Sequence, residues 1–197
     1  KYNTDVYRNT LLDLSGNGNH GTLANFSFTD GSGYVKDSSG GLKFDGVDDV
    51  VTISGDFTFK EKSFTYFIDF ETPKPATEQN NNIDLGFGFY SHRANSQIYN
   101  YLTSNPDGTT IGDVKVTAGR HIFVCKIVKD FTDAKYFLDG NSVTIWGRLL
   151  PDGTPVIFNP RPGGTRIGTG GMKKINKLML WNRVLTEQEI QQLMEVE

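Results

Sequence analysis

Residues 11–23 read LLDLSGNGNHGTL, and residues 40–53 read GGLKFDGVDDVVTI. In the first stretch, apolar ends enclose a run of Gly, Asn, Asp and Ser, residues that tolerate positive φ or hydrogen-bond their own backbone through short side chains. This composition predicts a structured loop. The second stretch has apolar residues on both sides of the segment DGVDD (45–49), a pattern that predicts two short strands separated by a turn.

Alternating apolar residues predict further strands. In the clearest, 63–70, the face expected to lie in the core carries Phe64, Tyr66, Ile68 and Phe70. We also expect strands at 21–29, 83–91, 96–102, 120–128, 134–138, 142–146 and 174–181, and loops at 30–41, 71–82 and 147–164. Asp139 and Gly140 predict a tight hairpin. Many short strands with abundant turn residues predict an all-β sandwich.

The C-terminal segment has the signature of a helix start. Thr186 and Glu189 have the spacing of a capping box, and Leu185 and Ile190 have that of a hydrophobic staple. Ile190, Leu193 and Met194 form one apolar face of a short helix. We expect this helix to dock on the sandwich or to cover a sheet edge.

Four motifs together resemble a known family, the laminin-G-like, concanavalin A-like jelly rolls of secreted bacterial and phage proteins. The motifs are DLSGNGNHG (13–21), GGLKFDGVDD (40–49), YFLDGN (136–141) and an ending of RIG (166–168), LMLWNRVLT (178–186) and Glu189-Ile190. They occur in the family's order and span nearly the whole chain. The resemblance implies a two-sheet antiparallel jelly-roll sandwich with a short C-terminal helix. It also implies an extracellular, cell-surface or virion location, but no particular function, because one fold hosts many unrelated sites.

Composition narrows the classes of function. The 197 residues are enough for one domain with a substantial core, and we expect a single domain over 1–197. A net charge of −3 without a Lys/Arg-rich block argues against nucleic acid as a partner. No apolar run approaches the ~20 residues of a membrane span. Since residue 1 is Lys rather than Met, we expect a chain trimmed at its N-terminus. The single cysteine, Cys125, lies in an apolar strand-like run and is expected in the core.

The sequence offers no complete catalytic constellation. Glycosidases need two facing carboxyl groups, and the nearest pair on one expected strand is Asp69 and Glu71, which we expect to be solvated. The three histidines lack a G-x-S-x-G elbow, and their spacing does not indicate a zinc site. His20 ends the glycine-rich loop, where we expect a structural hydrogen-bonding role. The chain is therefore expected not to be an enzyme.

Calcium is an alternative for the two motif loops. Asp13, Asn17 and Asp49 are the leading candidate ligands, and Asn19, Asp45 and Asp48 are further hard oxygen donors in the same loops. Turns in which Asp, Asn and Ser side chains hydrogen-bond to the nearby backbone explain the same residues. No glutamate is present in either loop to act as a bidentate ligand. We favour turns and expect no obligatory cofactor, with Ca²⁺ as the alternative.

Carbohydrate binding needs aromatic faces for stacking, with polar groups nearby for the hydroxyls. The segment YSHRANSQIYNY (90–101) has this composition, and Trp146 followed by Gly147-Arg148 is a second candidate. Tyr99 and Tyr101 share one strand face, so both are core residues or both are presented to a ligand. Arg93 would be the polar partner. The candidate carbohydrate-binding residues are thus Arg93, Tyr99, Tyr101 and Trp146.

The leading hypothesis is a non-catalytic binding module, with glycans as its partners, on a secreted, cell-surface or phage-particle protein. The first alternative is a structural or decoration domain of a phage or surface assembly that has no small ligand. The second alternative is a divergent glycoside-cleaving enzyme. An exposed aromatic cluster favours the first reading, a large apolar patch the second, and a cleft with two facing carboxylates the third.

Overall fold

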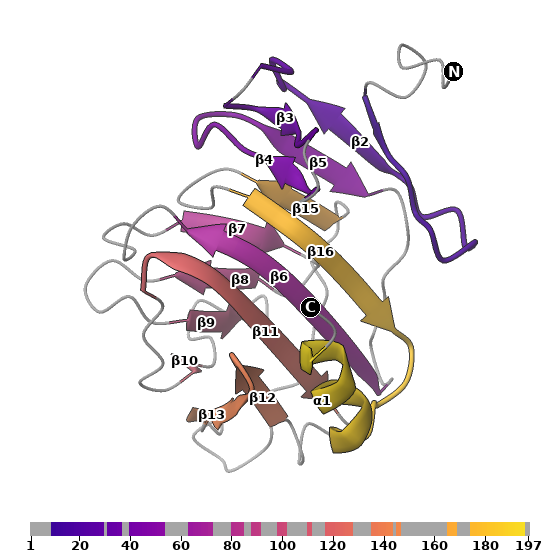
Figure 1. Cartoon of the computed structure of the whole chain (residues 1–197), viewed down its shortest axis with the longest axis vertical. Helices are drawn as coiled ribbons and strands as arrows, with labels where there is room; N and C mark the ends of the chain where they lie inside the picture. Colours follow the sequence, from indigo (N-terminus) through magenta and orange to yellow (C-terminus); the bar gives the residue numbers. More distant parts are fainter. Residues whose placement is uncertain are drawn as a thin grey trace, which may run out of the picture.

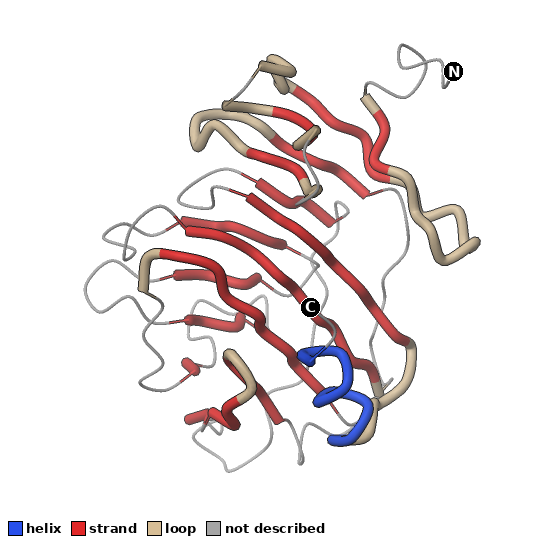
Figure 2. The backbone as a smooth tube through the Cα atoms, in the orientation of Figure 1, coloured by secondary structure: helices blue, strands red, loops and turns tan. Residues whose placement is uncertain are grey.

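A computed structural model of the chain describes residues 9–29, 31–36, 40–53, 63–72, 80–84, 88–91, 98–101, 110–111, 117–127, 135–143, 145–146, 165–168 and 174–195. The described chain is almost entirely β, with one C-terminal helix (Figures 1 and 2). No helix within these ranges is long and apolar enough to cross a membrane.

Two seven-stranded antiparallel sheets form the two layers of the fold. The first sheet has, in spatial order, β1 (Thr10–Leu11), β2 (Gly21–Ala24), β5 (Val50–Ile53), β15 (Thr165–Gly168), β7 (Asn80–Asp84), β8 (Gly88–Ser91) and β9 (Ile98–Tyr101). The second has β13 (Asn141–Val143), β12 (Lys135–Leu138), β11 (Gly119–Ile127), β6 (Phe64–Thr72), β16 (Lys174–Trp181), β4 (Leu42–Lys43) and β3 (Gly33–Tyr34). A small third sheet pairs β10 (Thr110–Ile111) with β14 (Ile145–Trp146). This arrangement confirms the predicted all-β, two-sheet antiparallel sandwich.

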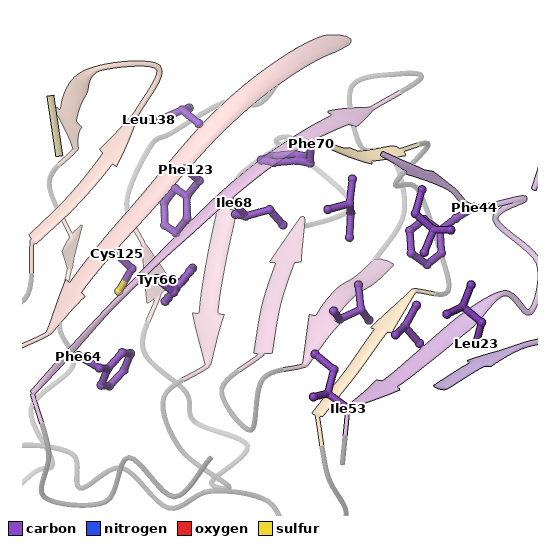
Figure 3. Packing of buried hydrophobic residues seen from close by; sticks show 14 of the residues in the cluster. Leu23, Phe44, Ile53, Phe64, Tyr66, Ile68, Phe70, Phe123, Cys125 and Leu138 are labelled. Carbon is purple, nitrogen blue, oxygen red and sulfur yellow. The ribbon is translucent and has the colours of Figure 1, made fainter. Parts of the chain in front are cut away.

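The core lies between the two large sheets (Figure 3). Its largest contributors from β6 are the four alternating residues Phe64, Tyr66, Ile68 and Phe70, each at most 2 % exposed. Phe123 and Cys125 of β11 join them, and Val51 and Ile53 of β5 come from the opposite sheet. The period-two pattern therefore predicted the inward face of β6 correctly, and Cys125 is a core residue as expected. Burial raises the pKa of the Cys125 thiol well above its ordinary value, so the thiol is protonated and inert.

A second apolar cluster lies on the outer face of the second sheet. Phe67 of β6 and Val124 of β11 pack there against Leu185 and Ile190. The helix α1 (Glu187–Glu195) supplies Ile190 and covers this face, where it is drawn as the coiled ribbon in front of β6 and β11 (Figure 1). Both faces of β6 are therefore buried. The expected docking of the terminal helix on the sandwich is confirmed.

The hairpin and helix-start predictions are also confirmed. Asp139 and Gly140 have φ of 49° and 78°, as a type I′ turn requires, and they join the paired strands β12 and β13. The Thr186 hydroxyl accepts a hydrogen bond from the Glu189 backbone N–H at 3.2 Å, and the Glu189 carboxylate accepts one from Thr186 N–H at 2.8 Å. These two bonds complete the capping box.

Several strand and loop predictions are wrong in extent. The strand expected at 142–146 is instead β13 and β14, which belong to different sheets, and the loop expected at 30–41 contains β3. The strand expected at 21–29 ends at Ala24, because Asn25 adopts a φ of 68° and leaves the ladder. The single strand expected at 83–91 is instead the pair β7 and β8, in which Ile83 faces Phe89 across the ladder. The loop expected at 71–82 contains the end of β6 and the start of β7. Residues 80–82 are all asparagines, yet β8 supplies ladder partners for Asn80 and Asn81, and this pairing overrides their weak strand propensity.

Candidate functional site

The candidate aromatic residues lie at one end of the first sheet and in the small sheet beside it. Tyr99 and Tyr101 are on β9, where Tyr99 is directly opposite Tyr90 of β8 and Tyr101 opposite Gly88. Trp146 is on β14, opposite Thr110 of β10, and β10 lies against β9. Strands β8, β9 and β10 follow one another in Figure 1. Chain segments far apart in sequence thus converge on one corner, whereas Arg93 lies outside the described residues.

The glycine-rich loop is held by its own polar side chains. The two carboxylate oxygens of Asp13 accept hydrogen bonds from the backbone N–H groups of Ser15 at 2.8 Å and Asn19 at 2.9 Å. Hydrogen bonds from the side chain and backbone of Ser15, and then from Asn19, lower the pKa of Asp13 below its ordinary value. Asn17 donates its amide to the Ser15 hydroxyl at 2.9 Å. These contacts are those of a self-bonding turn.

His20 closes the same loop. Its Nδ1 accepts a hydrogen bond from the Asp13 backbone N–H at 3.0 Å. This is a structural contact of the kind expected from the sequence. The ring fixes the start of the loop to its end, immediately before β2 begins at Gly21.

Asp49 lies in the turn between β4 and β5 and is 1 % exposed. Its Oδ2 accepts a hydrogen bond from the Asp45 backbone N–H at 2.8 Å, and the Ser32 side chain also bonds to the carboxylate. Desolvation raises the pKa of Asp49, with smaller contributions in the same direction from the charges of Asp45 and Asp48. The carboxylate is thus a buried element of a turn, with two further acids beside it.

The three candidate metal ligands do not come together. Gly21 of β2 pairs with Ile53, and Ala24 of β2 pairs with Val50, so the loop before β2 and the turn before β5 lie at opposite ends of this strand pair. Figure 1 shows the 12–20 loop well away from the turn that joins β4 to β5. Asp13 and Asn17 therefore cannot share an ion with Asp49.

The nearest carboxylate pair is not arranged for glycoside hydrolysis. Asp69, expected to be solvated, is 1 % exposed on the outer face of β6, which corrects the sequence-based expectation. Its carboxylate accepts hydrogen bonds from Arg120 at 2.9 and 2.7 Å and from the Asn176 amide at 2.8 Å. Glu71 lies 3.3 Å from the Lys174 ammonium. Because both acids are held by cations of neighbouring strands, neither is poised to protonate a leaving group.

Sequence reasoning missed a surface hollow of about 580 Å³ between β11, the β12–β13 turn and the end of α1. It is lined by Arg120, His121, Ile122, Asp139, Gly140, Gln191, Met194 and Glu195. His121 Nδ1 lies 2.8 Å from Asp139 Oδ2, and Nε2 lies 3.0 Å from the Thr117 carbonyl oxygen. His121 and Asp139 thus bond to each other, and the lining residues that the structure describes include no phenyl, phenol or indole ring for stacking. The hollow arises from helix docking, which leaves no local sequence signal.

No protein-family model and no curated protein matches the chain. Solved structures do match it. Domain 4 of AbnA, an extracellular GH43 arabinanase of Geobacillus stearothermophilus in complex with arabinotriose, has a TM-score of 0.67 at 14 % identity, covering 95 % of this chain and 94 % of that one. Botulinum neurotoxin type C, in a structure concerned with its interaction with two ganglioside molecules, has a TM-score of 0.64 at 13 % identity, covering 95 % and 48 %.

Trypanosoma rangeli sialidase, in complex with 2,3-difluorosialic acid, has a TM-score of 0.58 at 14 % identity, covering 89 % of this chain and 29 % of the enzyme. The chain thus spans less than a third of the sialidase and about half of the toxin chain, whereas it spans nearly all of the arabinanase domain. At these identities the likeness concerns the fold alone. This chain therefore shares its β-sandwich architecture with domains of glycan-binding and glycan-cleaving proteins.

Proposed function

We propose that this chain is a non-catalytic carbohydrate-binding module of a secreted, cell-surface or phage-particle protein. The observation that carries the proposal is the match to AbnA domain 4, which extends over nearly the full length of both chains and whose structure contains arabinotriose. The laminin-G-like motifs of the sequence support the same class of protein. The engagement of Asp69 and Glu71 by neighbouring cations supports a binding role over a hydrolytic one.

The corner formed by β9, β10 and β14 is the place we propose for the glycan. Its backbone brings Tyr99, Tyr101 and Trp146 into one neighbourhood. Aromatic rings stack on the apolar faces of sugar rings, and water replaces this contact poorly. Hydroxyl hydrogen bonds largely exchange with solvent, so the rings would supply most of the affinity and Arg93 the orientation.

The test is calorimetric titration of the purified chain with arabino-oligosaccharides and, separately, with ganglioside glycans, with and without chelator. Tyr99→Ala, Tyr101→Ala and Trp146→Ala should each lose binding while leaving the melting temperature nearly unchanged. Tyr34→Ala is the matched control: Tyr34 is 40 % exposed, but its strand β3 is the outermost strand of the other sheet, so binding should persist.

A core tyrosine would behave differently. Replacing it should cost ~3–5 kcal/mol of unfolding free energy. If all three aromatic variants are destabilised to that degree, the rings are core and this corner is not the site. If no glycan binds the parent protein, the module is not a carbohydrate-binding one.

A further inference from the structure

The turn between β4 and β5 gathers three carboxylates. One oxygen from each of Asp45, Asp48 and Asp49 lies within 4.8 Å of the others. Calcium binds oxygens at 2.3–2.6 Å, so two ligands on opposite sides of one ion are about 4.8 Å apart. The three oxygens are therefore close enough together to contact a single calcium ion.

The turn holds the carboxylates of Asp45 and Asp49 in place without neutralising any of the three acids. Asp45 Oδ1 accepts the backbone N–H groups of Val47 at 2.8 Å and Asp48 at 3.4 Å, while Asp45 N–H bonds to Asp49 Oδ2. Among the described residues, no ion pair includes any of the three acids. Three adjacent negative charges repel one another, and the repulsion is strongest where a charge is removed from water.

Asp49 provides an independent sign of a missing partner. The residue is 99 % buried, and its Oδ1 has less than 1 Å² of exposed surface yet accepts no hydrogen bond from the described residues. A buried carboxylate oxygen without a donor is costly, and protein structures rarely leave one unpaired. A cation beside Oδ1 would remove that cost, whereas the hydrogen bonds within the turn do not.

We propose that Asp45, Asp48 and Asp49 bind one Ca²⁺ ion. Asp45 and Asp48 are exposed, so water can complete the six to eight ligands that calcium takes. Magnesium fits less well because it demands near-ideal octahedral geometry at 2.0–2.1 Å. This site differs from the set expected from sequence, since Asp13 and Asn17 lie at the other end of β2.

The ion would join two loops. Asp48 accepts a hydrogen bond from the Asn25 amide at 3.0 Å through its backbone carbonyl, and Asp49 is bonded to Ser32. Calcium bound to both acids would therefore tie the 25–32 segment to the β4–β5 turn. Three strands separate β5 from β9 in the first sheet, so the site does not depend on the proposed glycan corner.

The experiment is titration of chelator-treated, dialysed protein with calcium chloride, followed by calorimetry and by melting temperature. We expect binding with a dissociation constant of about 10⁻⁴–10⁻³ M, the range of extracellular calcium modules, and a rise in melting temperature. Asp48→Asn should weaken binding by about tenfold or more, because affinity follows the number of ligand charges. Among the described residues, Asp48 makes hydrogen bonds only through its backbone, so the variant should fold. Asp49→Asn should abolish binding.

Asp13→Asn is the matched control, because it makes the same substitution in the other motif loop and should keep calcium affinity unchanged. Three results would each overturn the proposal. The first is no heat of binding and no shift in melting temperature at a calcium concentration about 10-fold above the expected dissociation constant. The second is equal calcium affinity in Asp48→Asn and the parent, and the third is loss of calcium binding in Asp13→Asn alone.

Discussion

Arg120 of β11 donates two parallel hydrogen bonds to the carboxylate of Asp69 of β6. Its Nε lies 2.9 Å from Oδ1, and its Nη2 lies 2.7 Å from Oδ2. The two residues are diagonal neighbours, since Arg120 is directly opposite Glu71 and Asp69 opposite Ile122. The Asp69 side chain is 2 % exposed, whereas that of Arg120 is 43 % exposed. The ion pair therefore neutralises a buried charge from the solvent side.

Removing the cation should destabilise the fold. In Arg120→Ala, the Asn176 amide is the one remaining partner of the Asp69 carboxylate among the described residues, and we expect the free energy of unfolding to fall by on the order of 2 kcal/mol. This is below the ~3–5 kcal/mol of a fully buried pair, because water can reach the vacated place. Urea denaturation measures this loss of stability.

The control is Lys135→Ala, which breaks the exposed ion pair with Glu187 and should leave the denaturation midpoint nearly unchanged. Equal midpoints for the parent and both variants would contradict the prediction.

The capping box should contribute measurably to the docking of α1. Thr186→Ala removes the hydroxyl that accepts the Glu189 N–H, and we expect a cost of about 1 kcal/mol. Thr186→Ser retains the acceptor and should recover most of the loss. Thermal denaturation compares the three proteins, and coincident transitions for the Ala variant and the parent would mean that the cap adds nothing.

The Arg183–Glu189 pair should make stability depend on acid pH. Hydrogen bonding to Arg183, then to Thr186 N–H, lowers the pKa of Glu189 from 4.5 to about 2. Because the folded pKa is lower, the contribution of Glu189 is complete above pH 4.5 and is lost as pH falls toward about 2. The difference in melting temperature between the parent and Glu189→Gln should narrow through this window. A constant difference down to pH 2 would refute the linkage. In Arg183→Ala the pKa of Glu189 in the folded state should lie closer to 4.5, so the narrowing should be smaller and should end at a higher pH.

Gly41 should tolerate substitution far less than Gly16. Both have positive φ, +94° and +84°. A Cβ on Gly41 would lie 2.6 Å from the Ile175 carbonyl oxygen of β16, whereas one on Gly16 would meet nothing within 4 Å. Gly16→Ala should therefore cost about 1–2 kcal/mol for the backbone conformation alone, and Gly41→Ala a further ~1–3 kcal/mol for the clash. Denaturant midpoints give both values, and similar losses would show that the chain relaxes around Gly41.

Local sequence carried most of the information about individual strands. The alternation in β6 predicted its core face, the boundaries 174–181 coincide with β16, and the spacing from Leu185 to Ile190 located the start of α1. These features depend on residues within one element. The turns at Asp13 and Asp139 were likewise predictable, because their hydrogen bonds or φ values are set by neighbours in the chain.

Pairing between distant segments was not predictable. Asn176 bonds to Asp69 across 107 positions, and no pattern in either segment indicates that the strand containing Asn176 will pass beside β6 with a bulge. The same holds for the candidate sites. The sequence indicated that Tyr99 and Tyr101 share a strand face, but only the pairing of β14 with β10 and the contact of β10 with β9 bring Trp146 near them. The acids of residues 45–49 were visible as oxygen donors, whereas the burial of Asp49 beside Ser32 depends on how two loops fold together.

The positions of β15 and β16 determine when this molecule can finish folding. β15 lies between β5 and β7 in one sheet, and β16 lies between β4 and β6 in the other, so the last two strands of the chain complete the middle of both sheets. While a ribosome is still making residues 165–181, the earlier strands have open edges and no central partner. Such long-range closure is slow, and exposed edges invite pairing with other chains. Until β16 forms, each nascent chain therefore exposes the unpaired edges of β4 and β6.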